Sequence, residues 1–125
     1  MGDMPKRILL VEDEENIALA LSYLIGREGY ALRHVSDGAA AIHALEEERP
    51  DLVVLDAMVP EVSGYSLCQY IRDHDALNDL KVLMISAAGE STRRRALEIG
   101  ADAFFLKPFD TKALTGQIGA MLEHA

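Results

Sequence analysis

The stretch RILLVEDEEN, residues 7–16, decides the fold, because a short apolar run leads directly into four consecutive acids. A short continuous apolar run is typical of a parallel strand that is buried on both faces of a sheet. Similar runs recur along the chain and are separated by longer segments with a different apolar spacing. The predicted strands are residues 7–11, 31–35, 52–55, 82–85 and 103–106.

Between these strands, apolar residues recur every three or four positions, which predicts amphipathic helices. The helical patterns are centred on residues 17–25, 41–45, 64–71, 92–99 and 114–122. The residues predicted to bound these helices are Gly29, Asp37, Pro50, Ser91, Gly100 and Asp110. Five strands alternating with five helices predict an α/β domain whose sheet is mostly parallel.

Length and charge limit the class of protein. The chain has 125 residues and a formal net charge of −9, which suits one domain over residues 1–125 with a core over about 6–122. The acidic charge argues against direct binding of nucleic acid, which needs a basic face. No apolar run approaches the about 20 residues of a membrane span, and the single Cys68 fits a reducing, cytoplasmic location.

Polar residues follow the predicted strands at their carboxyl ends, where ligands bind in doubly wound sheets. These residues are Glu12, Asp13, Asp56, Ser86 and Lys107. Two like charges about 4 Å apart repel by roughly 4 kcal/mol at an effective dielectric constant of about 20, so crowded carboxylates indicate a positive partner. Oxygen ligands suit Mg²⁺, and an aspartate beside Mg²⁺ is a plausible phosphoryl acceptor.

The order and spacing of these residues resemble the receiver domain of bacterial two-component response regulators, over residues 6 to about 122. The motifs that carry the resemblance are Glu12-Asp13, Asp56 followed by Pro60 and Gly64, Ser86, and Lys107-Pro108. The resemblance implies a flavodoxin-like, doubly wound sheet with strand order 2-1-3-4-5 and five helices on both faces. That order places the first and third strands side by side, so the acids that follow them converge.

The resemblance also implies a role for each residue of this cluster. Asp56 would accept a phosphoryl group from a histidine kinase or a phosphotransfer protein in a Mg²⁺-dependent reaction. Asp13, Asp56 and the backbone carbonyl of Met58 would bind Mg²⁺, and Glu12 would hold a metal-bound water. Lys107 and Ser86 would contact the phosphoryl group. The chain would catalyse only its own phosphorylation and slow dephosphorylation, and would not be an enzyme in the usual sense.

Ser86 and Phe104 would form a switch, and the Lys107–Pro108 peptide bond would be cis. Because Phe104 lacks a hydroxyl group, we expect its ring to lie inward much of the time even without phosphate. The fourth helix, fifth strand and fifth helix, with the arginines of residues 93–95, would form the partner surface. The chain would be either a single-domain regulator or the receiver of a larger protein.

Dimerisation in the manner of winged-helix transcription factors usually uses charged residues on the fifth strand and fifth helix. Ala103, Ala113 and Gln117 stand where such charges are expected. The sequence therefore predicts a monomer or a weak dimer.

Three other functions are alternatives to that of a phosphoacceptor receiver domain. A Mg²⁺-dependent phosphatase with an aspartate nucleophile would carry a second aspartate where Met58 stands. A flavodoxin-like cofactor site needs a phosphate loop after the first strand, where this chain has four acids. A degenerate receiver that works only by protein contact would lack part of the site.

The four histidines, His34, His43, His74 and His124, show no ligand spacing and are expected to be surface or filler residues, and Cys68 is expected in the core.

Overall fold

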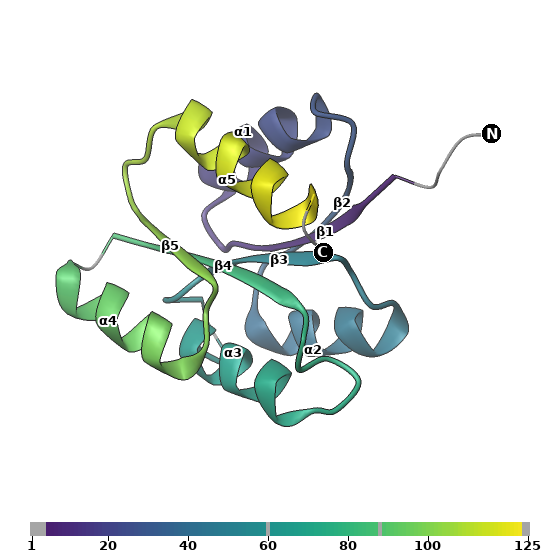
Figure 1. Ribbon diagram of the computed structural model, residues 1–125, viewed down its shortest axis with the longest axis vertical. Helices are drawn as coiled ribbons and strands as arrows, with labels where there is room; N and C mark the ends of the chain where they lie inside the picture. The colour runs from purple at the N-terminus through teal and green to yellow at the C-terminus, as the bar shows by residue number, and fades with distance from the viewer. Residues whose placement is uncertain (1–4, 60, 88, 124–125) are drawn as a thin grey trace.

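The computed structural model describes residues 5–59, 61–87 and 89–123. These residues form one parallel five-stranded sheet in the order β2-β1-β3-β4-β5 and five helices (Figure 1). The strands are β1 (Arg7–Val11), β2 (Ala31–Val35), β3 (Leu52–Asp56), β4 (Lys81–Ser86) and β5 (Ala103–Leu106). The helices are α1 (Glu15–Gly26), α2 (Gly38–Glu47), α3 (Gly64–Asp73), α4 (Glu90–Ile99) and α5 (Thr111–Glu123). The predicted fold class and strand order are confirmed.

The helices cover the two faces of the sheet unequally. Helices α1 and α5 pack on one face, while α2, α3 and α4 pack on the other (Figure 1). Each face has its own apolar cluster, because alternate side chains of a strand point to opposite sides. Leu10 of β1 belongs to the α1 and α5 side, whereas Leu9 and Val11 belong to the opposite side. Cys68 of α3 is fully buried in this second cluster, as predicted, and burial raises the pKa of its thiol.

The strands differ in burial as their sequences differ in hydropathy. Every residue of β3 is buried, including Asp56, and only the first residue of β1 and of β4 is partly exposed. Strand β2 lies at an edge of the sheet and has no fully buried residue. The three strands that read as continuous apolar runs are therefore the three central strands.

Two predicted helix boundaries are wrong, and both errors involve glycines with left-handed backbone angles. Helix α1 ends at Gly26 with Arg27 as its C-cap, and Gly29, with a φ of 95°, lies in the turn beyond. Helix α4 begins after Gly89, whose φ of 89° is a conformation that favours glycine, so Ser91 lies inside the first turn.

The other helix boundaries agree better with the sequence. Asp37 caps α2 by accepting a hydrogen bond from the Ala40 amide at 2.7 Å, and the Lys112 amide donates to Asp110 Oδ1 at 2.9 Å at the start of α5. Gly100, with a φ of 121°, is the C-cap of α4. Helix α2 ends at Glu47, ahead of Pro50, because Glu48 is already extended.

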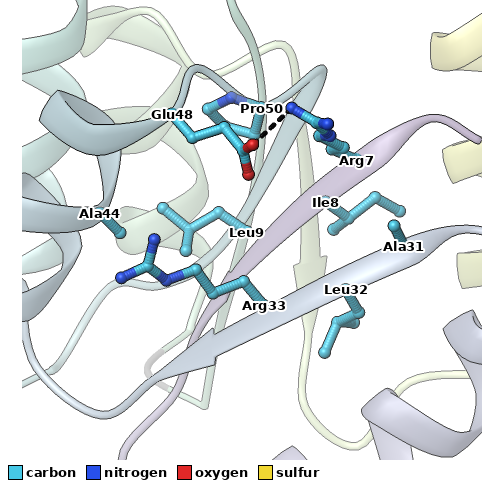
Figure 2. A pocket seen from close by; sticks show the side chains of 9 residues that line it. All are labelled: Arg7, Ile8, Leu9, Ala31, Leu32, Arg33, Ala44, Glu48 and Pro50. Atoms are coloured by element: carbon cyan, nitrogen blue, oxygen red, sulfur yellow. Dashed lines mark hydrogen bonds and ion pairs between the residues drawn. The ribbon is translucent and has the colours of Figure 1, made fainter. Parts of the chain in front are cut away.

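A small cavity lies at the amino ends of β1 and β2, beside α2 (Figure 2). Its lining includes Arg7, Arg33 and Glu48, and an ion pair of 2.6 Å joins Arg7 Nη1 to Glu48 Oε2. The predicted site residues follow the opposite, carboxyl ends of the strands. This cavity is therefore at the wrong end of the sheet to be the predicted ligand site.

Candidate functional site

The pairing of β1 with β3 brings the acids of the site together. Val11 is in register with Leu55, so Glu12 and Asp13 leave the sheet beside Asp56, the last residue of β3. One carboxylate oxygen from each of these three acids lies within 4.8 Å of the others. Glu12 is fully buried and Asp56 is 5% exposed, whereas Asp13 is exposed to solvent. The cluster thus has two buried carboxylates and one that faces solvent.

Lys107 supplies the positive charge of this cluster. It follows β5 directly, and its Nζ donates hydrogen bonds to Asp56 Oδ2 at 2.7 Å and to Glu12 Oε1 at 3.0 Å. Burial alone would lower the pKa of Lys107, but the bonds to Asp56 and Glu12 raise it above its ordinary value. The lysine is therefore charged at physiological pH. The Lys107–Pro108 peptide bond is cis, the isomer that the resemblance implies.

Glu12 is the most perturbed acid of the site. Its pKa is raised from 4.5 to about 7, mainly because the carboxyl is buried and also because the charge of Asp56 lies nearby. The amide of Glu14, which donates to Glu12 Oε2 at 3.1 Å, and the ammonium of Lys107 act in the opposite direction. A carboxylate whose desolvation is only partly compensated favours the approach of another positive charge.

The backbone around Asp56 depends on a close approach by α3. Asp56 Oδ1 accepts a hydrogen bond from the Met58 amide at 2.8 Å, and the Gly64 amide donates to the Ala57 carbonyl at 3.0 Å. A Cβ at Gly64 would overlap the Asp56 carbonyl oxygen and the Ala57 Cα. Gly64 therefore lets the start of α3 lie directly against the end of β3. Pro60, the other residue of this motif, lies outside the described residues.

The two residues predicted to form a switch lie on neighbouring strands. Ser86 ends β4 and is fully buried, and Phe104 of β5 is 6% exposed, so its ring is in the inward position. The guanidinium of Arg93 lies 5.1 Å from the centre of the Phe104 ring. Met58, two residues after Asp56, is in contrast 66% exposed.

One contact of the site was missed by the sequence analysis. The ring of His34, expected to be a surface or filler residue, is exposed, but its Nε2 lies 2.8 Å from the backbone carbonyl oxygen of Glu12. The position of His34 in the predicted second strand could have indicated this contact, because His34 pairs with Leu10 on the adjacent strand, two residues before Glu12. His124 lies outside the described residues.

The donor set agrees with one class of cation. Glu12, Asp13 and Asp56 offer only carboxylate oxygens, which hard cations such as Mg²⁺ prefer over nitrogen and sulfur ligands. These three residues could hold a metal ion, and Asp13 is the exposed acid of the three.

Comparison with known families decides the identity of the chain, because the model of the response regulator receiver domain matches residues 8–119. The chain belongs to this family. The receiver domain is 40% identical to the transcriptional regulatory protein GltR of Pseudomonas aeruginosa, over 96% of the chain and 50% of GltR. It spans about half the length of the curated relatives it matches, which are transcriptional regulators.

Solved structures agree with this assignment. The signal receiver domain of a histidine kinase from Syntrophus aciditrophicus superposes with a TM-score of 0.90 and 31% identity, covering 96% of this receiver domain and 92% of that chain. The receiver domain of a sensor histidine kinase from Pseudomonas aeruginosa, with a magnesium ion coordinated in its active site cleft, gives a TM-score of 0.88 and 26% identity over 96% and 99% of the two chains. Within the described residues, no helix of this receiver domain combines the length and apolarity that crossing a membrane requires.

Proposed function

We propose that this receiver domain accepts a phosphoryl group on Asp56, taken from a histidine kinase or a phosphotransfer protein. The observation that carries the proposal is the arrangement around Asp56, a carboxylate 5% exposed and bonded to Lys107 Nζ at 2.7 Å, with Glu12 and Asp13 beside it. A structural ion pair would need one acid for each cation, whereas here one lysine pairs with Glu12 and Asp56, and Asp13 lies beside these two acids.

The transfer step uses the residues of the site in distinct roles. A carboxylate oxygen of Asp56 attacks the phosphorus, a P–O bond forms, and the P–N bond to the donor histidine breaks. The donor nitrogen keeps the electron pair of that bond and takes up a proton. Lys107, already beside Asp56, stabilises the charge on the transferred oxygens, and the hydroxyl group of Ser86 binds one of them.

Mg²⁺ supplies charge neutralisation at the phosphoryl oxygens, and Glu12, Asp13, Asp56 and the Met58 carbonyl would hold it. The magnesium ion in the related Pseudomonas aeruginosa receiver domain supports this choice of cation. We expect the phosphoryl group to be lost slowly, since the residue two positions after Asp56 is Met58. Met58 has no acid or base to activate water, which also argues against a phosphatase-like hydrolase.

Phosphorylation would alter the surface formed by α4, β5 and α5. Movement of the loop after β4 would let Ser86 reach the phosphoryl group, and the inward Phe104 would be stabilised. Two arginines of α4 contact aromatic rings beside this region: the Arg93 guanidinium lies over the Phe104 ring, and that of Arg95 lies 4.3 Å from the centre of the Tyr65 ring of α3. A downstream protein or effector domain would bind this surface.

The proposal also covers the location of the domain, its oligomeric state and its contact with nucleic acid. Residues 1–125 would act as a single cytoplasmic receiver unit, a monomer or weak dimer, with no direct contact to nucleic acid. The net charge of −9 supports the last point. Ala103, Ala113 and Gln117, in place of charged residues, support the weak tendency to dimerise.

The first test is phosphorylation by a small donor. With acetyl phosphate and Mg²⁺, we expect the intact mass of the wild type to increase by one phosphoryl group, and that of Asp56→Asn to stay unchanged. Asp75→Asn, which alters an exposed aspartate in the loop before β4, is the matched control and should be labelled like the wild type. Equal labelling of Asp56→Asn would show that another residue is the acceptor.

A further inference from the structure

The backbone of Glu12 is held by β2 from both sides. Its amide donates to the Val35 carbonyl at 3.1 Å, which continues the pairing of β1 with β2 for one residue beyond the strand. Its carbonyl accepts from the ring Nε2 of His34 at 2.8 Å. The first contact is an ordinary sheet hydrogen bond, but the second is made by a side chain and therefore depends on the identity of residue 34.

His34 reaches this carbonyl by extending along the sheet. It pairs with Leu10, and its side chain runs forward past the end of β1 to Glu12. The ring also lines a groove beside the first half of α1, next to Asn16 and Leu19. His34 therefore lies beside β1 and α1, the two elements that precede and follow the loop with Glu12 and Asp13.

The contact fixes more than a single oxygen atom. The Glu12 carbonyl and the Asp13 amide belong to one planar peptide unit, so holding the carbonyl oxygen restricts rotation of the whole unit. That unit sets the direction in which the chain continues into Asp13. The Glu12 side chain is independently restrained by Lys107 and by the Glu14 amide.

We infer that His34 is a positioning residue of the metal site, whose Nε2–H holds the Glu12–Asp13 peptide so that both carboxylates face Asp56. This inference rests on the proposed function, since it concerns the Mg²⁺ site of the phosphoryl transfer. Three acids close together repel one another, and this repulsion favours spreading of the loop that carries Glu12 and Asp13. The His34 contact opposes the spreading without adding a ligand.

The chemistry of the contact defines the variants that test it. A carbonyl oxygen only accepts hydrogen bonds, so residue 34 must present a donor. His34→Gln keeps an N–H donor on a side chain of similar reach, whereas His34→Leu and His34→Phe remove it. His43→Leu is the matched control, because it removes another exposed histidine, on α2, with 80% of its side chain accessible.

The experiment is a titration of residues 1–125 of each variant with MgCl₂, followed by calorimetry and by the amide chemical shifts of Asp13 and Asp56. We expect His34→Leu to weaken Mg²⁺ binding about fivefold, the loss that corresponds to one net hydrogen bond. His34→Gln and His43→Leu should stay within about twofold of the wild type. His34→Phe retains an aromatic ring in the groove and provides the same comparison if His34→Leu does not fold.

The outcomes separate this inference from the function on which it rests. If the wild type binds no Mg²⁺, both are overturned. If the wild type binds Mg²⁺ and the donor-free variants bind it equally well, the positioning role is wrong and the metal site stands. If His34→Gln binds as weakly as His34→Leu, the hydrogen bond is not the cause and the inference also fails.

Discussion

The two ends of the sheet each contain an ion cluster, and the clusters differ in how completely their charges are satisfied. At the amino ends of β4 and β5, Arg72 donates to the carbonyls of Gly100 and Leu80 at 2.9 and 2.6 Å and to Asp102 Oδ2 at 2.9 Å. The same Asp102 oxygen accepts from the Val82 amide at 2.8 Å. One cation faces one acid there, and backbone carbonyls use its remaining donors.

The cluster at the carboxyl ends is unbalanced in comparison. Among the residues that the structure describes, Lys107 is the one cation paired with Glu12 and Asp56, and Asp13 lies beside them. The pKa of Glu12 is raised to about 7, mainly by burial and in part by the charge of Asp56. A satisfied cluster stabilises the fold, whereas the cluster at the carboxyl ends has carboxylate oxygens left over that could hold a metal ion.

The strongest test of this contrast is removal of Arg72. We expect Arg72→Met to lower the free energy of unfolding by about 3 kcal/mol, because it leaves Asp102 without its cation and the partly buried carbonyls of Leu80 and Gly100 without this donor. Arg49→Met is the matched control, since Arg49 forms an exposed pair with Asp79 and should matter by less than about 1 kcal/mol. Urea unfolding measures both, and similar losses in the two variants would contradict the contrast.

The second test uses the pH dependence of stability without metal. The pKa of Glu12 is about 7 in the folded protein and 4.5 as its ordinary value, so the folded state binds the proton more tightly. The contribution of Glu12 is therefore complete below pH 4.5 and is lost as the pH rises through 7. We expect Glu12→Gln to be more stable than the wild type above pH 7, by on the order of 2 kcal/mol.

This prediction is checked by urea unfolding in a chelator at several values between about pH 5 and 8. Glu98→Gln, which changes an exposed acid of α4, should leave the slope of stability against pH unchanged. An equal slope in the wild type and Glu12→Gln would mean that Glu12 does not titrate in this range.

The smallest expected effect concerns the exposed acid of the cluster. Asp13→Asn should raise the free energy of unfolding by roughly 0.5–1 kcal/mol in the absence of metal, because it removes one repelling charge that solvent already screens. Mg²⁺ should then raise the melting temperature of the wild type and have less effect on Asp13→Asn. Thermal unfolding with and without Mg²⁺ decides this, and equal responses would place the cation elsewhere.

The sequence predicted the central part of this fold because burial leaves a clear pattern there. The apolar runs of β1, β3 and β4 follow directly from their position between two helical layers, and the acids after them follow from the shared edge of a parallel sheet. The fifth strand was found from its place in the alternation. The strand order came from the family resemblance and not from the residues themselves.

Side-chain contacts between segments far apart in the chain could not be predicted from the sequence. Arg72 joins α3 to the carbonyls of Leu80 and Gly100, and no periodic pattern records which arginine will do so. The helix start at Gly89 was missed because Ser91 has the better capping side chain, whereas the backbone angle at Gly89 decides the boundary. His34 was missed because its partner is a backbone carbonyl, which the sequence does not mark.

The burial of Cys68 has a consequence for measuring the motions of this molecule. Its thiol is fully enclosed by the apolar cluster under α2, α3 and α4, and it is the single cysteine of the chain. A thiol reagent can reach it only when this layer separates from the sheet, so the labelling rate counts such openings. Because α4 belongs to the same layer, the labelling rate of Cys68 would also report whether this layer loosens when Asp56, the proposed phosphoryl acceptor, is modified.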